Sequence, residues 1–467
     1  MMRSGWRESG SRWRNVVGLL WRTMNYRTAA FLIVGIVTIV SVVAVPLKVT
    51  VDGVLYISSA KSLFKSDFAT NYVWYREPGY PLFLKALHYL GNDGLFVVAA
   101  QAICLGLASF IALYAVRRML RQTNVTVAQV ILTVLLTLNP MYLIYSALVL
   151  QQALFTLQLA LCALGVVWAL RRPAWLSRSA LLILVALNYF VAIWTSIGWL
   201  YLGLVPVTLT IVLCLWPETL RQLQKATTLL WRSLAGFLLA VGIVALCALV
   251  YVFGLQAYSG WDAVKAPYLR NAQVAGAVIE PLSSVPYIPT VQEMTSRMFA
   301  LMHIGTISPY TQENDLFLRQ QMLPDWAFSQ WDTKFIAEPY SSYADGYFSL
   351  PNPSDVLHNV IAKNSGSAPT LYSAAFVGFL LALALALVRR KWGLLLVLST
   401  PLAFIAVYAA SNSPIDRYGI PAYPWAVASV GVLLTWLGRL LLTTPFGRRL
   451  RARFRGGVRS RIALSDL

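Results

Sequence analysis

Long apolar runs without a charged side chain recur along this sequence of 467 residues. Each run has about 20 residues, the length that an α-helix needs to cross the hydrocarbon core of a bilayer. Only 12% of all residues are charged, about half the usual share in a soluble globular protein. The sequence therefore predicts an all-α polytopic membrane protein with about ten transmembrane helices. The ten runs are Thr28–Pro46, Gly94–Val116, Val125–Met141, Ser146–Leu170, Ser179–Trp194, Ile197–Trp216, Leu234–Leu255, Thr370–Val388, Trp392–Ala410 and Pro421–Gly438.

The fifth and sixth runs are the weakest pair. Only Thr195 and Ser196 separate them, and Trp194 ends the fifth run. Two short helices joined as a hairpin fit this pattern, and a re-entrant hairpin is the alternative.

The net charge of +20 is divided unevenly between the two sides of this topology. The side that holds both termini has 26 of the 38 Lys and Arg but only three of the 18 acidic residues. Because positively charged loops stay in the cytoplasm, we expect both termini there and the protein in the cell (inner or plasma) membrane. The Arg-rich segment Arg448–Arg461 then anchors the topology near anionic lipid, and the basic composition does not call for a nucleic-acid partner.

The predicted spans divide the chain into five parts. These are a basic cytoplasmic tail (1–27), an N-terminal membrane domain (28–255), an exterior loop domain (256–369), C-terminal membrane helices (370–440) and a basic cytoplasmic tail (441–467). The first exterior loop is expected to hold two interfacial helices within 52–92. We expect Asp52 to open the first one, with an apolar stripe that includes Val54, Ile57 and Ala60. The second follows Pro78 and has a stripe of Phe83, Ala86, Leu87 and Leu90.

Chemistry is expected on the exterior face. The cytoplasmic loops are short and basic and contain no nucleotide-binding motif. The histidines are scattered rather than paired, and no metal-ligand spacing is present. The cysteines fall inside predicted spans, where they fit as small packing residues. These residues are His88, His303 and His358, and Cys104, Cys162, Cys214 and Cys247.

Single exterior residues have simple structural explanations. Asp52 fits a helix N-cap, Glu77 a helix start, and Arg417 an interfacial anchor. Their placement together on one face of an otherwise uncharged bundle favours a functional site.

Five short motifs occur in order along the membrane part. The first is VDGVLYISSAKSL, which contains Asp52 and Tyr56 and follows the first span. The others are REPGYPLFL with Arg76 and Tyr80, Gln101 early in the second span, Asn139–Pro140 at the end of the third, and DRYGIP with Arg417 and Tyr418. This ordered set resembles the GT-C superfamily of integral-membrane glycosyltransferases that use polyprenyl-phosphate sugar donors. The resemblance is to the branch of protein-mannosyltransferase-like and aminoarabinose-transferase-like proteins, over residues 28–255 and 370–440.

The resemblance implies a glycosyltransferase that moves a sugar from a polyprenyl-phosphate co-substrate to a hydroxyl of a glycan, lipid or protein acceptor, with inversion. The phosphate leaving group needs cations, and the acceptor hydroxyl needs a base. Asp52 is the candidate base. The donor-phosphate candidates are Arg76 and Arg417, with Lys61 as a lesser one, and the substrate-orienting candidates are Tyr56, Tyr80, Tyr418 and Glu77. No metal ligand is assigned, and a need for a divalent metal is left open.

Two departures keep other functions open. Gln151 and Gln152 stand where the superfamily often has Glu, and its Arg near the fifth span is missing around WTSIG. A non-catalytic member is therefore one alternative, and a scaffold whose exterior loop binds a partner is another. A polytopic transporter or lipid flippase is a third, although ion-coupled transport usually needs ionisable residues within the bilayer. A surface-polysaccharide polymerase or ligase is the fourth.

The topology predicts opposite labelling at two serines. In a variant without the four native cysteines, Ser284→Cys should react with an impermeant thiol reagent in intact cells, because the 256–369 loop is expected outside. Ser465→Cys should react only after permeabilisation, because the C-terminal tail is expected in the cytoplasm. Labelling of position 465 but not 284 in intact cells would invert the topology.

Overall fold

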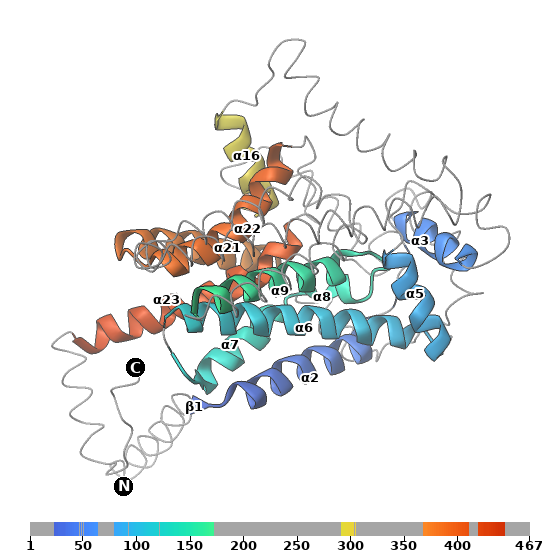
Figure 1. Cartoon of the computed structure of the whole chain (residues 1–467), viewed down its shortest axis with the longest axis horizontal. Helices are drawn as coiled ribbons and strands as arrows, with labels where there is room; N and C mark the ends of the chain where they lie inside the picture. Colours follow the sequence, from blue (N-terminus) through green and yellow to red (C-terminus); the bar gives the residue numbers. More distant parts are fainter. Residues whose placement is uncertain are drawn as a thin grey trace, which may run out of the picture.

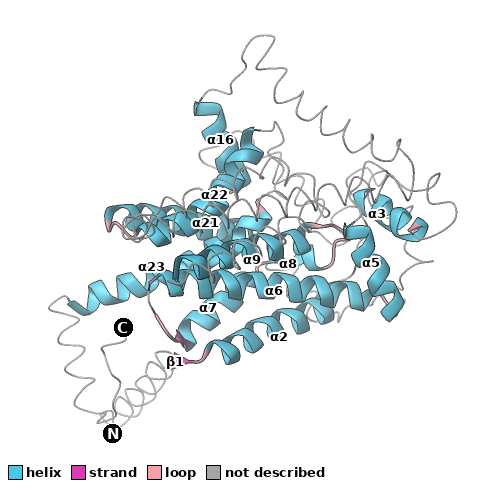
Figure 2. Cartoon of the chain, in the orientation of Figure 1, coloured by secondary structure: helices cyan, strands magenta, loops and turns pink. Residues whose placement is uncertain are grey.

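The computed structural model describes residues 23–45, 47, 49, 51–63, 79–91, 93–120, 122–171, 291–302, 304, 368–410 and 419–443. These residues are almost entirely helical (Figure 2). The predicted fifth, sixth and seventh spans, most of the exterior loop domain and most of both tails lie outside the described residues.

Three described helices are long and apolar enough to cross a membrane: α2 (Tyr26–Ala44), α6 (Gly94–Met119) and α21 (Ala368–Val388), the last over Thr370–Val388. A bent pair, α7 (Val127–Thr137) and the segment Pro140–Ser146, makes a fourth. The helices α9 (Gln152–Arg171), α22 (Trp392–Ala410) and α23 (Tyr423–Thr443) lie where the fourth, ninth and tenth spans were predicted, and each has a shorter apolar stretch. The chain is thus a multi-pass membrane protein, and the count of ten spans stays a prediction.

The first two spans pack closely along their length (Figure 1). A Cβ atom at Gly106 of α6 would lie 3.0 Å from the Cα atom of Val34 in α2, so glycine permits this approach. Along α2 the buried positions include small residues such as Ala29 and Ser41, whereas Phe31 and Ile39 are exposed. Small residues at helix contacts and large ones facing outward are the pattern of helices that pack in lipid.

A short strand pair was not predicted and qualifies the all-α description. Strand β1 (Thr23–Met24) pairs antiparallel with β2 (Val125–Thr126), at the end of α6 remote from α3 (Figures 1 and 2). Beside it, the buried Arg117 guanidinium donates to the Gln129 side chain and to the Asn124 carbonyl. These contacts hold the starts of α2 and α7 together at the end of α6.

The third span is broken rather than continuous. Helix α7 ends at Thr137, and the chain turns by 66° before α8 (Pro140–Leu143) and the 3-10 turn η1 (Ile144–Ser146). Proline cannot donate a helical backbone hydrogen bond, but it suits the first position of a helix. The Asn139 side chain caps that helix by accepting from the Met141 N–H at 2.9 Å. The predicted straight span Val125–Met141 is therefore wrong in its last turn, where Asn-Pro starts a new direction.

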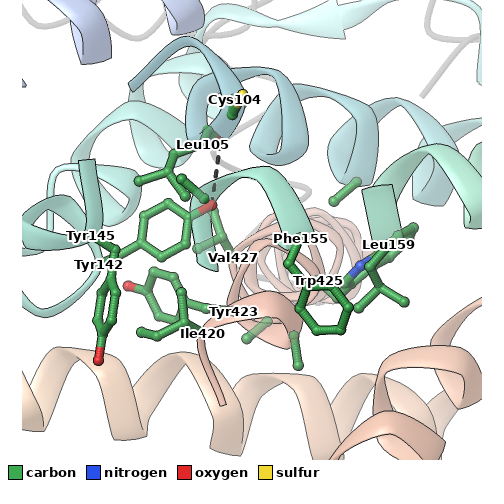
Figure 3. Close-up of a cluster of buried hydrophobic side chains, with 14 of the residues drawn as sticks. Cys104, Leu105, Tyr142, Tyr145, Phe155, Leu159, Ile420, Tyr423, Trp425 and Val427 are labelled. Carbon is green, nitrogen blue, oxygen red and sulfur yellow. Dashed lines mark hydrogen bonds between the residues drawn. The ribbon is translucent and has the colours of Figure 1, made fainter. Parts of the chain in front are cut away.

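A second group of helices covers α6. Helix α23 packs against α6 and α21, and α9 packs against α6. The rings of Tyr372 and Tyr423 stack with centroids 4.6 Å apart, and Tyr423 also contacts Tyr142 at 5.0 Å. The Tyr423 hydroxyl donates to the Leu136 carbonyl at the end of α7 (2.9 Å), and the Tyr142 hydroxyl donates to Leu105 of α6 (3.3 Å; Figure 3). The break is therefore held from two sides by tyrosines.

The described part of the exterior loop domain includes helix α16 (Val291–Leu301), which packs against α22. The buried Arg297 side chain donates to the carbonyl of Ala409, next to the C-terminal end of α22, at 3.4 Å. A cation interacts favourably with the negative end of a helix dipole. This contact joins α16 to the end of α22.

Replacing Tyr423 by Phe should lower the stability of the protein by about 1 kcal/mol, because the Leu136 carbonyl loses its hydroxyl donor where water is excluded. Thermal unfolding of the purified protein in detergent measures this loss. The matched control is Tyr89→Phe, since Tyr89 is 74% exposed. Equal midpoints for the two variants would contradict a stabilising role of the Tyr423 hydroxyl.

Candidate functional site

The helix that carries Asp52 is α3 (Val51–Ser62), which lies with α5 (Gly79–Leu90) at the end of α6 opposite to β1 (Figure 1). Helix α5 lies within the predicted stretch 52–92, and α3 begins one residue before it. Helix α3 begins at Val51, so Asp52 is its second residue and not the residue that precedes the helix. An acidic residue in a first helical turn still interacts favourably with the helix dipole.

The predicted stripe of α3 is confirmed at Ile57 and Ala60, and the buried face is wider than that stripe. Gly53, Tyr56, Ser59, Ala60 and Leu63 are all buried, as is Ile57, whereas Ser58 and Lys61 are partly exposed.

Gly53 allows α3 to approach the segment between η1 and α9. A Cβ atom at Gly53 would lie 3.0 Å from the carbonyl oxygen of Val149 and 3.2 Å from a methyl carbon of Val49. Glycine is needed here because any side chain would push α3 away from Val149. The residue after the candidate base is therefore fixed against the segment that follows the broken span.

A buried hydrogen-bond network joins α5 and α6 to the same segment. The Tyr80 hydroxyl donates to Gln101 Oε1 at 2.9 Å. Gln101 Nε2 donates to the carbonyls of Ser146 and Leu148, both at 3.0 Å. The Tyr56 ring meets the Tyr80 ring edge-on with centroids 4.9 Å apart. Tyr80 and Gln101 are both 0% exposed.

Burial decides the chemistry of Tyr80. Removal from water raises the pKa of its hydroxyl well above the ordinary value, and the nearby Tyr56 raises it further, while the Leu150 backbone acts in the opposite direction. Tyr80 is therefore a neutral donor, and its proton is directed at Gln101. The substrate-orienting roles of Tyr56 and Tyr80 stay predictions, because both rings lie in the protein core.

The predicted apolar stripe of α5 is confirmed only in part, because Leu87 is buried and Phe83 is partly buried but the other two residues are not. The structure buries Tyr80, Leu84 and Leu87, with Pro81 and Lys85 beside them, while Ala86 and Leu90 are exposed. In a membrane protein an apolar stripe can face lipid, so it does not mark the protein-facing side. The nearly buried Lys85, whose Nζ atom lies 5.8 Å from the centre of the Tyr89 ring, was not predicted.

The cation candidates are only partly placed. Lys61 follows Asp52 by nine residues on α3, about 13 Å along the helix axis and about half a turn around it. It therefore lies away from the turn that holds Asp52. Arg76, Glu77, Arg417 and Tyr418 lie outside the described residues, so a phosphate pocket shared by Arg76 and Arg417 stays a prediction. The segments that carry them adjoin α5 and the 3-10 turn η5 (Ile420–Ala422). In the described part of the chain, no three His, Cys, Asp or Glu residues are grouped for a metal ion.

Sequence comparison gives no relative, because no protein-family model and no curated protein matches the chain. Solved structures do match. One is the archaeal oligosaccharyltransferase AglB from Archaeoglobus fulgidus, in complex with an inhibitory peptide and a dolichol-phosphate (TM-score 0.43, 13% identity). The match covers 94% of this chain and 53% of AglB, so the chain spans about half the length of that protein.

The others are structures of ArnT from Cupriavidus metallidurans. The one bound to undecaprenyl phosphate has a TM-score of 0.34 and 14% identity, over 88% of this chain and 78% of ArnT. The apo state has a TM-score of 0.32 and 15% identity, over 85% and 74%. All three TM-scores are below 0.5, and all three identities are 15% or less.

Gly53→Val should lower both stability and activity. The added methyl groups cannot fit beside Val149, and overpacking of this kind costs about 1–3 kcal/mol. Gly35→Val is the matched control, because a Cβ atom at Gly35 has no neighbour within 4 Å. Thermal unfolding and transfer assays on both variants measure the difference. A Gly53→Val protein as stable and active as the control would show that α3 does not need its close approach.

Proposed function

We propose that this protein is a glycosyltransferase that moves a sugar from a polyprenyl-phosphate donor to a hydroxyl of a glycan, lipid or protein acceptor at the exterior face of the membrane. Asp52 accepts the proton of the acceptor hydroxyl. The acceptor oxygen then bonds to the anomeric carbon as the bond to the phosphate oxygen breaks, and polyprenyl phosphate leaves. Direct displacement inverts the anomeric centre.

One observation carries this proposal. Gly53 packs against Val149, and Tyr56 packs against the hydrogen-bonded Tyr80, so the turn that contains Asp52 is held at two points. A general base must be held within hydrogen-bond reach of the proton that it removes. A helix turn fixed next to the broken span supplies the rigid support that such a base requires.

Cations are the second requirement. The leaving phosphate develops negative charge, which Arg76 and Arg417 are proposed to stabilise, since a guanidinium can bind two phosphate oxygens at once. In the sequence their segments adjoin Tyr80 of α5, which donates to Gln101, and Tyr423 after η5, which donates to Leu136 at the break. Dolichol-phosphate in the AglB structure and undecaprenyl phosphate in the ArnT structure are lipids of the class proposed as donor.

The position of buried charge disfavours an ion-coupled transporter. Among the described residues, the buried charged side chains are Lys85, Arg117 and Arg297. Lys85 is on α5, Arg117 is in the last turn of α6, and Arg297 is on α16. None lies midway along a described span, where coupling residues of such transporters are usually found.

Asp52→Asn should lower turnover by about 10²–10⁴-fold, the usual contribution of general-base assistance. Asparagine is nearly isosteric and can take a similar place at a helix start, so folding and donor binding should persist. Purified protein with a lipid-linked sugar donor and a hydroxyl acceptor measures turnover.

The matched control is Asp93→Asn. Asp93 caps α6 by accepting from the Leu95 N–H at 2.9 Å, a role that asparagine can also fill. This variant should keep normal turnover. Normal turnover of Asp52→Asn as well would return Asp52 to a purely structural role and direct the search for a base to Glu77 or Asp416.

A further inference from the structure

The amide of Gln101 can adopt only one orientation in its site. Its Nε2 group faces two backbone carbonyls, those of Ser146 and Leu148, and its Oε1 atom faces the Tyr80 hydroxyl. Turning the amide over would place its oxygen against two acceptors. Both amide protons of Nε2 are used, and the whole side chain is buried.

Two routes lead from Gln101 to the turn that holds Asp52. On the first, the bonds to Ser146 and Leu148 fix the chain next to Val149, and Val149 meets Gly53. On the second, the bond to Tyr80 fixes a ring that meets Tyr56, one helical turn after Asp52. Both routes end on the first two turns of α3. Gln101 itself belongs to α6, a long helix packed against α2, α9 and α23. Because α6 is held by these contacts, Gln101 has a fixed position from which both routes start.

We infer that Gln101 is a positioning residue for the proposed reaction. It does not touch the substrate, and it sets the place of Asp52 by holding the 146–148 backbone and Tyr80 in one arrangement. This inference rests on the proposed function for its kinetic consequence. Its structural consequence, the placement of α3, can be measured in a protein with no assayed activity.

Gln101→Leu removes the amide at similar volume. Turnover should fall by about 10- to 100-fold, since a misplacement of about 1 Å can cost 10²-fold. The acidic limb of the turnover–pH profile should shift, because the surroundings of Asp52 change. A purely structural role predicts a smaller active fraction, which scales the profile without shifting it. Donor titration gives the active fraction of each preparation.

The second measurement is the distance between two nitroxide labels, one on α3 at Ser58→Cys and one on α21 at Val377→Cys, without the native cysteines. Val377 is 42% exposed and lies on a separate helix. Gln101→Leu should shift or broaden this distance. Tyr80→Phe removes only the bond to Gln101 and keeps both bonds from Gln101 to the carbonyls, so it should change the distance less, in the same direction. This variant keeps the inference testable if Gln101→Leu does not fold.

Gln129→Leu is the matched control. Gln129 is also a buried glutamine, but it lies at the other end of α6, next to Arg117 and Thr126. This variant should change neither the 58–377 distance nor the pH profile. Unchanged distances in both Gln101→Leu and Tyr80→Phe would overturn the inference. An inactive wild-type protein would overturn the proposed function instead, while the distance shift would still support the placement of α3 by Gln101.

Discussion

The satisfaction of backbone polar groups at the break in the third span is the constraint on which the rest of the site depends. A straight helix within a membrane satisfies its own carbonyls, but a chain that turns at Asn139–Pro140 and becomes irregular after Ser146 needs further donors, and lipid offers none. Backbone N–H groups supply some of them, from Asn139 to Leu136 and from Leu150 to Leu148, and side chains supply others. Tyr423 donates to Leu136, and Gln101 donates to Ser146 and Leu148. Each of these side chains comes from another helix, so the need to pair a few carbonyls draws separate elements to one place.

The elements drawn together are those that carry the motifs. Tyr80 belongs to the segment that starts with Arg76, Gln101 is the early glutamine of the second span, and Tyr423 follows the segment with Arg417. Hydrophobic burial cannot select this arrangement in lipid, because lipid chains are as apolar as the side chains of the core. Hydrogen bonds and the close fit of Gly53 and Gly106 can select it. The support for the candidate base is thus built from directional contacts, which tolerate little displacement.

The sequence predicted those features that depend on composition over many residues. Apolar length located α2, α6 and α21, and turn residues located α5 and the end of α7. The stripe of α3 was confirmed at Ile57 and Ala60, but the stripe of α5 matched only in part, because periodicity separates apolar from polar positions, and in a membrane both kinds can face protein. Leu90 is exposed and Lys85 is buried for this reason. The bonds of Gln101 join residues 21, 45 and 47 positions away, and no local pattern contains such pairings. A two-residue strand is also too short for any period to reveal.

The strand pair β1–β2 limits how the chain can cross the membrane. Residues 23–24 are bonded to residues 125–126, so these two points of the chain lie on the same side of the membrane. The stretch between them must therefore cross the bilayer an even number of times. Helices α2 and α6 already make two crossings, so α3 and α5 together contribute none or a complete return. Two backbone pairings thus require an even number of bilayer crossings between residues 24 and 125. This requirement does not depend on the distribution of charge.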